Sequence, residues 1–296
     1  MSAEEESSAV NLLDALRGGG KPLPDASPVI NALCVDMDDL AEGIREMGYP
    51  LGHHGYFVER ETINLLESLN TLGLKATFFI PGSVALGAKS AVMAVMAEGH
   101  EIASHGDRHF PAFKLSRAAF YDDVKRAKQR LEAMTGKQVN TFKAPIWSVT
   151  EGSPWAYEAL LEAGYTVDHS AMPSFVKKLG YEAGRLSPFI YGEKLKVIPA
   201  TSVKISGKAI PFCGGLYNAY VPSWIEKRVF GKINSTGVPF NYFFHPYEHS
   251  PEAGNKRLLK HRSLFVSAYA AHAGAYGRKL KYLAQHFKFA PLREVY

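Results

Sequence analysis

From Val29 onward, short apolar runs alternate with longer amphipathic segments. The segment 59–72 illustrates the second type, because Ile63, Leu66, Leu69 and Leu72 recur at helical spacing. The apolar runs have the length of buried strands, and Gly or Pro often marks where a segment ends. The predicted strands are 29–35, 76–80, 100–104, 139–143, 165–168, 197–199 and 240–244.

The predicted helices occupy most of the segments between these strands. Two of them have clear end signals: one follows the N-cap Ser116 and stops at Gly136, and one begins at Ser153-Pro154 and ends at Gly164. The others cover 59–72, 84–97, 223–232 and much of 257–287. Strands that alternate with helices indicate βαβ units and a mainly parallel sheet. About seven strands in a chain of 296 residues favour an α/β barrel over an open sheet.

Composition adds limits on the class of protein. We expect a polar N-terminal lead over residues 1–28 and one domain over residues 29–296, since no Pro- or Ser-rich linker divides the interior. The net charge of +5 is small for this length, so we expect no nucleic-acid partner. The two cysteines form no disulfide framework, and there is no secretory signal and no long apolar run. We therefore expect no membrane span, and a cytoplasmic protein by default.

Side chains capable of chemistry follow the predicted strands at their carboxyl ends. In parallel barrels these ends meet at one rim, where active sites form. Residues far apart in the sequence are therefore expected to meet there, namely Asp36, Asp38, Asp39, His105, His109, Lys143, Asp168 and His245.

Two of these groups have the composition of a metal site. His105 and His109 are four residues apart and would share one face if the segment turned helically, although such a pair is often only a surface pair. Asp36, Asp38 and Asp39 would repel one another unless a cation or a shared proton neutralised them, the alternative being a turn with N-capping aspartates. Together the groups favour a site with two histidines and one carboxylate, which leaves positions open for water and substrate.

Two further residues have more than one interpretation. His245, between an aromatic run and Pro246, is a candidate general acid or a packed core histidine. Lys143 either extends to solvent or pairs with one of the carboxylates and lowers its pKa.

The order of Asp36-x-Asp38, His105-x3-His109, Lys143-Ala144-Pro145 and Phe244-His245-Pro246 resembles carbohydrate esterase family 4, the NodB-homology polysaccharide deacetylases. The stretches 58–85 and 97–109 are very similar to the core of that family. The tail, from 213–250 to 287–296, resembles a subgroup found with bacterial exopolysaccharide and lipopolysaccharide biosynthesis genes.

This resemblance implies a distorted (β/α)7 barrel with a divalent metal of the zinc type. It implies that Asp38, His105 and His109 are the metal ligands, with Asp39 as the competing carboxylate. It gives Asp36 the role of catalytic base and His245 that of catalytic acid.

Two supporting positions also follow from the resemblance. Lys143 stands where the family usually has an arginine that pairs with the base, and lysine keeps the charge but loses the planar two-pronged geometry. Asp168, in Asp168-His169-Ser170, is the candidate for the aspartate that tunes the catalytic histidine.

The predicted activity is hydrolysis of an N-acetyl group on a sugar or glycan that belongs to cell-surface polysaccharide or lipopolysaccharide biosynthesis. We expect backbone N–H groups near Ala144 or Trp147 to stabilise the oxyanion, and Pro145 and Trp147 to contact substrate. Two alternatives remain: a related amidohydrolase acting on a small non-peptide C–N bond, and an inactive sugar-binding homologue, which the lysine at position 143 motivates. The sequence sets neither the sugar, its carrier nor the oligomeric state.

Overall fold

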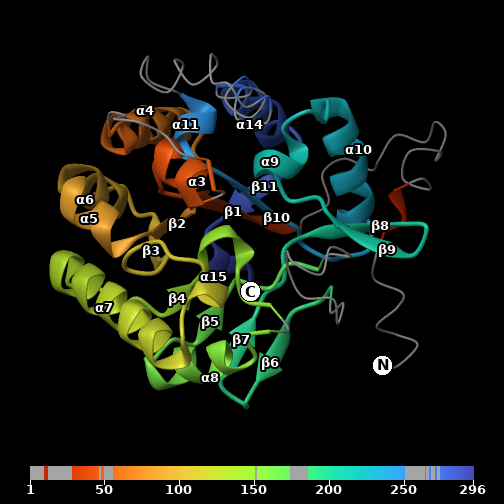
Figure 1. Ribbon diagram of the computed structural model, residues 1–296. Coiled ribbons are helices and arrows are strands. Elements are labelled where there is room, and N and C mark those ends of the chain that lie inside the picture. Colours follow the sequence, from red (N-terminus) through yellow and green to blue (C-terminus); the bar gives the residue numbers. More distant parts are fainter. Residues whose placement is uncertain are drawn as a thin grey trace.

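The computed structural model describes residues 10–12, 29–46, 48–49, 56–150, 152–173, 186–250, 264, 267, 271 and 274–296. A curled, mainly parallel sheet forms its centre, in the order β10-β1-β2-β3-β4-β5-β7-β6, and β11 also pairs with β1 (Figure 1). These strands are β1 (Ile30–Asp36), β2 (Thr77–Ile80), β3 (Glu101–Ser104), β4 (Thr141–Phe142), β5 (Val167–Asp168), β6 (Phe189–Tyr191), β7 (Leu195–Val197), β10 (Asn241–Phe244) and β11 (Lys288–Ala290).

Every pairing in this sheet is parallel except that of β6 with β7. A separate antiparallel hairpin consists of β8 (Ser202–Ile205) and β9 (Lys208–Pro211).

The gap between β7 and β10 is bridged by side chains and loops instead of a strand pairing. Asn241 donates from its side-chain amide to the Pro199 carbonyl at 2.8 Å and accepts from the Thr201 N–H at 2.8 Å. Farther along β10, the Phe243 N–H donates to the Cys213 carbonyl at 2.8 Å. The predicted distorted (β/α)7 barrel is therefore confirmed, with an irregular closure on this side.

Most of the helices lie outside the strands, whereas α15 (Leu292–Val295) lies at the centre of the barrel end (Figure 1). The helices are α3 (Leu40–Glu46), α4 (Val58–Thr71), α5 (Gly82–Gly87), α6 (Lys89–Ala97), α7 (Arg117–Thr135), α8 (Trp155–Glu162), α9 (Gly215–Asn218), α10 (Ser223–Asn234), α11 (Pro246–His249), α14 (Tyr276–Ala284) and α15.

The longest of these, α7, forms for reasons visible in the sequence. The Ser116 hydroxyl accepts the Ala119 N–H at 3.2 Å at its start, and Gly136 ends it with a φ of 65°. Phe120, Val124 and Leu131 are buried on its inner face.

The alternation of side chains along the strands separates two apolar clusters. On β1, Leu33 and Val35 point outward into the large core beneath the helices, whereas Ala32 and Cys34 point into the barrel. Other strands follow the same rule, so that Phe79, Ala103 and Phe243 also belong to the interior cluster. A side chain two residues beyond an inward-facing position is therefore directed toward the barrel mouth.

The amino-terminal end of the barrel is filled by polar groups and the last helix. Glu101 accepts hydrogen bonds from the hydroxyls of Thr77 at 2.6 Å and Thr141 at 2.8 Å. The backbone at the start of α15 donates to two of these side chains, from Leu292 to Thr77 at 2.7 Å and from Arg293 to Glu101 at 3.1 Å. These bonds satisfy N–H groups that a helix start leaves unpaired.

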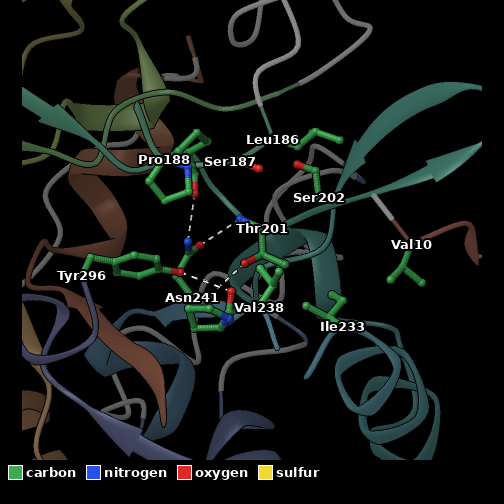
Figure 2. Close-up of a pocket in the computed structure, with 12 residues that line it drawn as sticks. Val10, Leu186, Ser187, Pro188, Thr201, Ser202, Ile233, Val238, Asn241 and Tyr296 are labelled. Carbon is green, nitrogen blue, oxygen red and sulfur yellow. Dashed lines mark hydrogen bonds between the residues drawn. The ribbon is translucent and has the colours of Figure 1, made fainter. Parts of the chain in front are cut away.

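A small pocket lies on the same side of the barrel (Figure 2). It is bounded by Val10, Pro188, Thr201, Asn241 and Tyr296, among others, and Asn241 begins β10 whereas His245 follows its end. The Thr201 and Asn241 side chains are bonded to each other's backbone N–H groups in Figure 2. The pocket is therefore distant from the chemistry-bearing rim.

The seven predicted strands are all present, with ends shifted by a few residues. The short strands β6, β8, β9 and β11 went unpredicted because three or four partly exposed residues give no clear pattern. The predicted helix 84–97 is wrong in one respect: Ala88, with φ −125° and ψ 44°, divides it into α5 and α6.

Other expectations fall largely outside the described residues. Within the predicted lead 1–28, only residues 10–12 are described, and the Val10 carbonyl accepts the Lys204 N–H of β8 at 3.0 Å. Much of the predicted helix 257–287 lies outside them too, and α14 forms near its end. In the described part of the chain, no helix has the length and apolarity needed to cross a membrane.

We expect Gly214→Ala to lower the free energy of unfolding much more than Gly237→Ala. Both glycines have positive φ, 97° and 79°, and such a backbone costs a residue with a side chain about 1–2 kcal/mol. A Cβ on Gly237 would meet open space, whereas one on Gly214 would lie 2.1 Å from the Phe243 carbonyl oxygen. Urea unfolding should show ~1–3 kcal/mol of additional loss for Gly214→Ala; equal losses would contradict the close approach.

Candidate metal centre and active site

The loop that follows β3 carries His105 and His109 but is not helical. Gly106 and His109 both have left-handed backbones, with φ of 77° and 57°, so the helical turn we considered for this pair is wrong. The turn between them is fixed by Asp107, whose N–H donates to the Asp123 carboxylate at 2.7 Å and whose own carboxylate accepts from Arg130 at 2.8 Å. Tertiary ionic contacts thus bring the two imidazoles together, with ring centres 4.8 Å apart.

Asp38, His105 and His109 form a compact, buried cluster. One ligand atom from each lies within 4.8 Å of the others, and the exposed fractions are 5%, 1% and 2%. Nε2 of His109 lies 3.2 Å from Oδ2 of Asp38. The other carboxylate oxygen of Asp38, Oδ1, is buried and has no hydrogen-bond partner among the described residues.

The protonation of His105 suits it to bind a cation. Its Nδ1 donates to the Lys143 carbonyl at 2.7 Å, so Nε2 carries the free lone pair. Burial lowers the pKa of His105 to about 3, although Asp36 opposes this, and the ring is therefore neutral at ordinary pH. Two imidazoles, of which His105 is neutral, and a carboxylate with an unsatisfied oxygen are a donor set that fits a zinc-type cation.

The two candidates for the carboxylate metal ligand, Asp38 and Asp39, have different hydrogen-bond partners. Oδ1 of Asp39 accepts the Ala41 N–H at 2.9 Å, and its Oδ2 accepts the Phe57 N–H at 3.1 Å. Asp39 therefore bonds to the start of α3 and to the approach to α4, which is the turn-capping alternative considered for these aspartates. Burial raises the pKa of Asp38, but His245 and His109 outweigh it and lower the pKa to about 2.

Asp36 lies deeper, at the end of β1, and forms a buried ion pair with Lys143. The ammonium nitrogen also lies 4.0 Å from the ring centre of Phe243 and 4.1 Å from that of Trp147. Burial raises the pKa of Asp36, but the Lys143 charge, followed by His105 and His245, lowers it below its usual value. Of the two interpretations of Lys143, the structure thus has the ion pair.

His245 reaches the cluster from β10. Its Nε2 lies 3.7 Å from Oδ1 of Asp38, and its Nδ1 lies 2.9 Å from the Glu248 carboxylate. Burial lowers the pKa of His245, but Asp38 and Glu248 outweigh it and raise the pKa to about 9. His245 is therefore protonated near neutral pH when no cation occupies the site.

Asp168 is buried beside the site, where it bonds to Ser170. Its oxygens accept the Ser170 N–H at 3.1 Å and the Ser170 hydroxyl, and burial raises its pKa to about 7 while these bonds oppose the rise. Ser170 in turn accepts the Ala144 N–H at 2.8 Å. Asp168 therefore supports the backbone next to Lys143.

Of the two expectations about the segment 144–147, the oxyanion donors need correction and the substrate contacts stay untested. The Ala144 N–H is used by Ser170, and the Trp147 N–H donates to the Ala144 carbonyl at 3.2 Å, so neither is available as an oxyanion donor. Pro145 and Trp147, the predicted substrate contacts, are both buried, and Trp147 packs against Lys143 and Phe243. Contact with a substrate therefore stays a prediction for these residues.

Glu248 is the site residue that sequence reasoning missed. It is 3% exposed and lies three residues after His245, at the third position of α11. The pattern His245-Pro246-Tyr247-Glu248 contains the signal, because a carboxylate at this spacing from a helix cap returns to it in a capping box.

Comparison with known proteins divides the chain near Asp168. Residues 53–167 match the model of the family described as polysaccharide deacetylase, and residues 169–296 match a domain of unknown function (DUF3473). A peptidoglycan deacetylase of Helicobacter pylori is 27% identical over 137 residues, 46% of this chain and 41% of that relative. The match thus spans about two fifths of the relative's length.

The fold has a counterpart among solved structures. A crystal structure assigned as a polysaccharide deacetylase from Mycobacterium smegmatis aligns with a TM-score of 0.54 and 18% identity, over 93% of this chain and 97% of that one. At this identity the likeness concerns the fold alone.

We expect Asp38→Asn and His105→Ala to weaken Zn²⁺ binding by more than ~100-fold, since each removes a proposed ligand. Asp39→Asn is the matched control and should bind Zn²⁺ with nearly unchanged affinity, because Asp39 bonds to backbone N–H groups. Calorimetric titration of metal-stripped protein measures the affinity. If Asp39→Asn loses Zn²⁺ and Asp38→Asn retains it, the assignment is reversed.

Proposed function

For a chain that carries a polysaccharide deacetylase domain, we propose the activity of a metal-dependent N-deacetylase. It hydrolyses the N-acetyl group of a sugar within a cell-surface glycan and releases acetate and a free amino sugar. The observation that carries this proposal is the meeting of three groups at one rim: the Asp38–His105–His109 cluster, the Asp36–Lys143 pair and His245.

Asp38, His105 and His109 are the proposed ligands of a divalent cation, of which zinc fits the donor set best. Such a cation polarises a carbonyl group and lowers the pKa of a water molecule from about 15.7 to about 7. The other groups at the rim then divide the proton transfers between them.

Asp36 is the proposed base. Its carboxyl group remains ionised at neutral pH because Lys143 lowers its pKa, and its Oδ1 has no hydrogen-bond partner among the described residues. That oxygen is available to accept the proton of the attacking water. Lys143 donates to the other oxygen, Oδ2, so the carboxylate is held in one orientation while Oδ1 remains able to accept a proton.

His245 is the proposed acid. It carries a proton near neutral pH, and its Nε2 faces the proposed metal ligand Asp38 across 3.7 Å. A cation held by Asp38 would offset part of the rise in the pKa of His245, because it neutralises that carboxylate, but Glu248 would still raise it. Donation of this proton to the nitrogen completes the hydrolysis as a neutral amine departs.

The substrate class rests on chemistry and likeness together. The matched family is described as polysaccharide deacetylase, and the Helicobacter pylori relative is named a peptidoglycan deacetylase. The resemblance of the tail to proteins of exopolysaccharide and lipopolysaccharide biosynthesis supports a glycan of that kind for this chain. The inactive-homologue alternative loses its motive, because Lys143 forms the ion pair expected of an arginine.

We expect Asp36→Asn and His245→Ala to lower kcat for acetate release by about 10²–10⁴-fold, the usual contribution of a general acid or base. Both variants should still bind Zn²⁺, and two control variants outside the site, Asp122→Asn at an exposed side chain and His286→Ala at a half-buried one, should retain full activity. Acetate release from N-acetylglucosamine oligomers, with zinc or cobalt supplied, is the measurement. A wild-type chain that binds zinc yet releases no acetate from free, lipid-linked or nucleotide-linked N-acetyl sugars would favour the sugar-binding alternative.

Lys143→Met should move the acidic limb of the kcat/KM profile to higher pH. Removal of the ammonium group leaves burial to raise the pKa of Asp36, so the base is ionised only at higher pH. Loss of a nearby opposite charge corresponds to a shift of ~1–3 pH units. Lys143→Arg keeps the charge and should keep the acidic limb near its original pH. If the limb does not move in Lys143→Met, Lys143 does not lower the pKa of the catalytic base.

A further inference from the structure

His245 is held at two points by one carboxylate oxygen. Oε2 of Glu248 accepts the backbone N–H of His245 at 2.8 Å and lies 2.9 Å from its ring Nδ1. The backbone bond alone would be an ordinary helix cap at the start of α11. The second bond goes to the ring, and it ties the orientation of the imidazole to the same capping residue.

The bond determines which ring nitrogen faces the site. A carboxylate accepts, so Nδ1 carries hydrogen, and Nε2 is directed at Asp38. The ring of Tyr247 stacks on the imidazole at 4.8 Å with an interplanar angle of 11°, and the ring of Phe243 meets it edge-on at 5.8 Å. A flip of the ring would keep it in the same plane but replace Nδ1 by a carbon, and would therefore break the hydrogen bond to Glu248.

Glu248 is well placed to hold this geometry. It is buried, and its backbone carbonyl accepts the Gly274 N–H at 2.8 Å, which ties α11 to the segment before α14. A buried, charge-assisted hydrogen bond is stronger than a neutral one and leaves less freedom to the donor.

Asp168, which the sequence resemblance offered for this task, has other contacts. Both of its oxygens bond to Ser170, and in the described part of the chain it makes no hydrogen bond to His245. It belongs to the outward set of side chains on β5, whereas its neighbours Val167 and His169 lie at the interior cluster. The strand alternation thus directs the Asp168 carboxylate away from the barrel interior.

We propose that Glu248 is the positioning residue of His245, fixing its tautomer and presenting Nε2–H to the leaving nitrogen, in place of Asp168. The proposal depends on the proposed deacetylase function for its kinetic consequence. Its structural consequence does not depend on activity, and the two parts can fail separately.

The structural part is tested by NMR of the folded protein with ¹⁵N-labelled histidine. A downfield Nδ1–H resonance, assigned by its absence in His245→Ala, should be present in the wild type. In Glu248→Ala it should be lost to solvent exchange. Glu248→Gln retains an acceptor oxygen and should show the resonance displaced upfield. Asp168→Asn should leave it in place. Survival of the resonance in Glu248→Ala, or its loss in Asp168→Asn, would overturn the proposal.

The kinetic part uses the same variants with zinc bound. Glu248→Ala should lower kcat for acetate release by ~10–100-fold with KM and Zn²⁺ affinity nearly unchanged, and Glu248→Gln should fall between it and the wild type. Full activity in a folded Glu248→Ala would overturn the positioning role. A wild-type enzyme without any activity would instead refute the deacetylase function, while the NMR result still reports on Glu248.

Discussion

Two buried carboxylates, Asp36 and Asp38, lie two residues apart at the end of one strand, and the arrangement of the rim follows from their need for positive charge. Lys143 neutralises Asp36 directly. Among the described residues, the positive charge near Asp38 comes from the imidazoles of His245, His109 and His105, and its Oδ1 has no hydrogen-bond partner there. A buried anion without full compensation is costly, so a divalent cation at Asp38 would complete the charge balance that the protein leaves open. Both buried carboxylates thus need a positive charge nearby: Lys143 supplies it for the proposed base Asp36, and a bound cation would supply it for the proposed ligand Asp38.

The alternation of side chains along parallel strands explains how much of this could be foreseen. Asp36, His105 and His245 each follow a residue of the interior cluster by two positions, and Lys143 follows Thr141, which bonds to Glu101 inside the barrel, in the same way. A sequence with recognisable strands thus predicts both the barrel and the convergence of these four. Asp168 ends a strand too, but it has the opposite parity, and its Ser170 contacts follow from that. A position at the end of a strand is therefore not enough to place a side chain in the site. The alternation of inward and outward side chains along β5 distinguishes Asp168 from the other four residues.

The remaining features depend on contacts that are distant in sequence or on irregular backbone. His109 has a left-handed backbone in a loop that Asp107 ties to Asp123 and Arg130 of α7, and no local pattern encodes this. The closure of the barrel by Asn241 and the loop bond from Phe243 to Cys213 is of the same kind. Glu248 differs, because its capping pattern was present in the sequence. Its contact with the imidazole, however, depends on the ring orientation of His245, which the capping pattern does not specify.

Two aromatic rings make a buried lysine possible at position 143, where the related family usually has an arginine. An arginine pairs with a carboxylate through a planar fork, whereas an ammonium group is a compact, strongly hydrated charge. Here Phe243 and Trp147 lie at about 4 Å from that charge and replace part of its hydration by attraction to their ring faces. The left-handed backbone of Ile146 and Trp147 places the indole ring there, and the Asp168–Ser170–Ala144 chain holds the strand end that carries Lys143. The segment 144–147 therefore supports the buried lysine, both through the indole ring of Trp147 and through the backbone of Ala144.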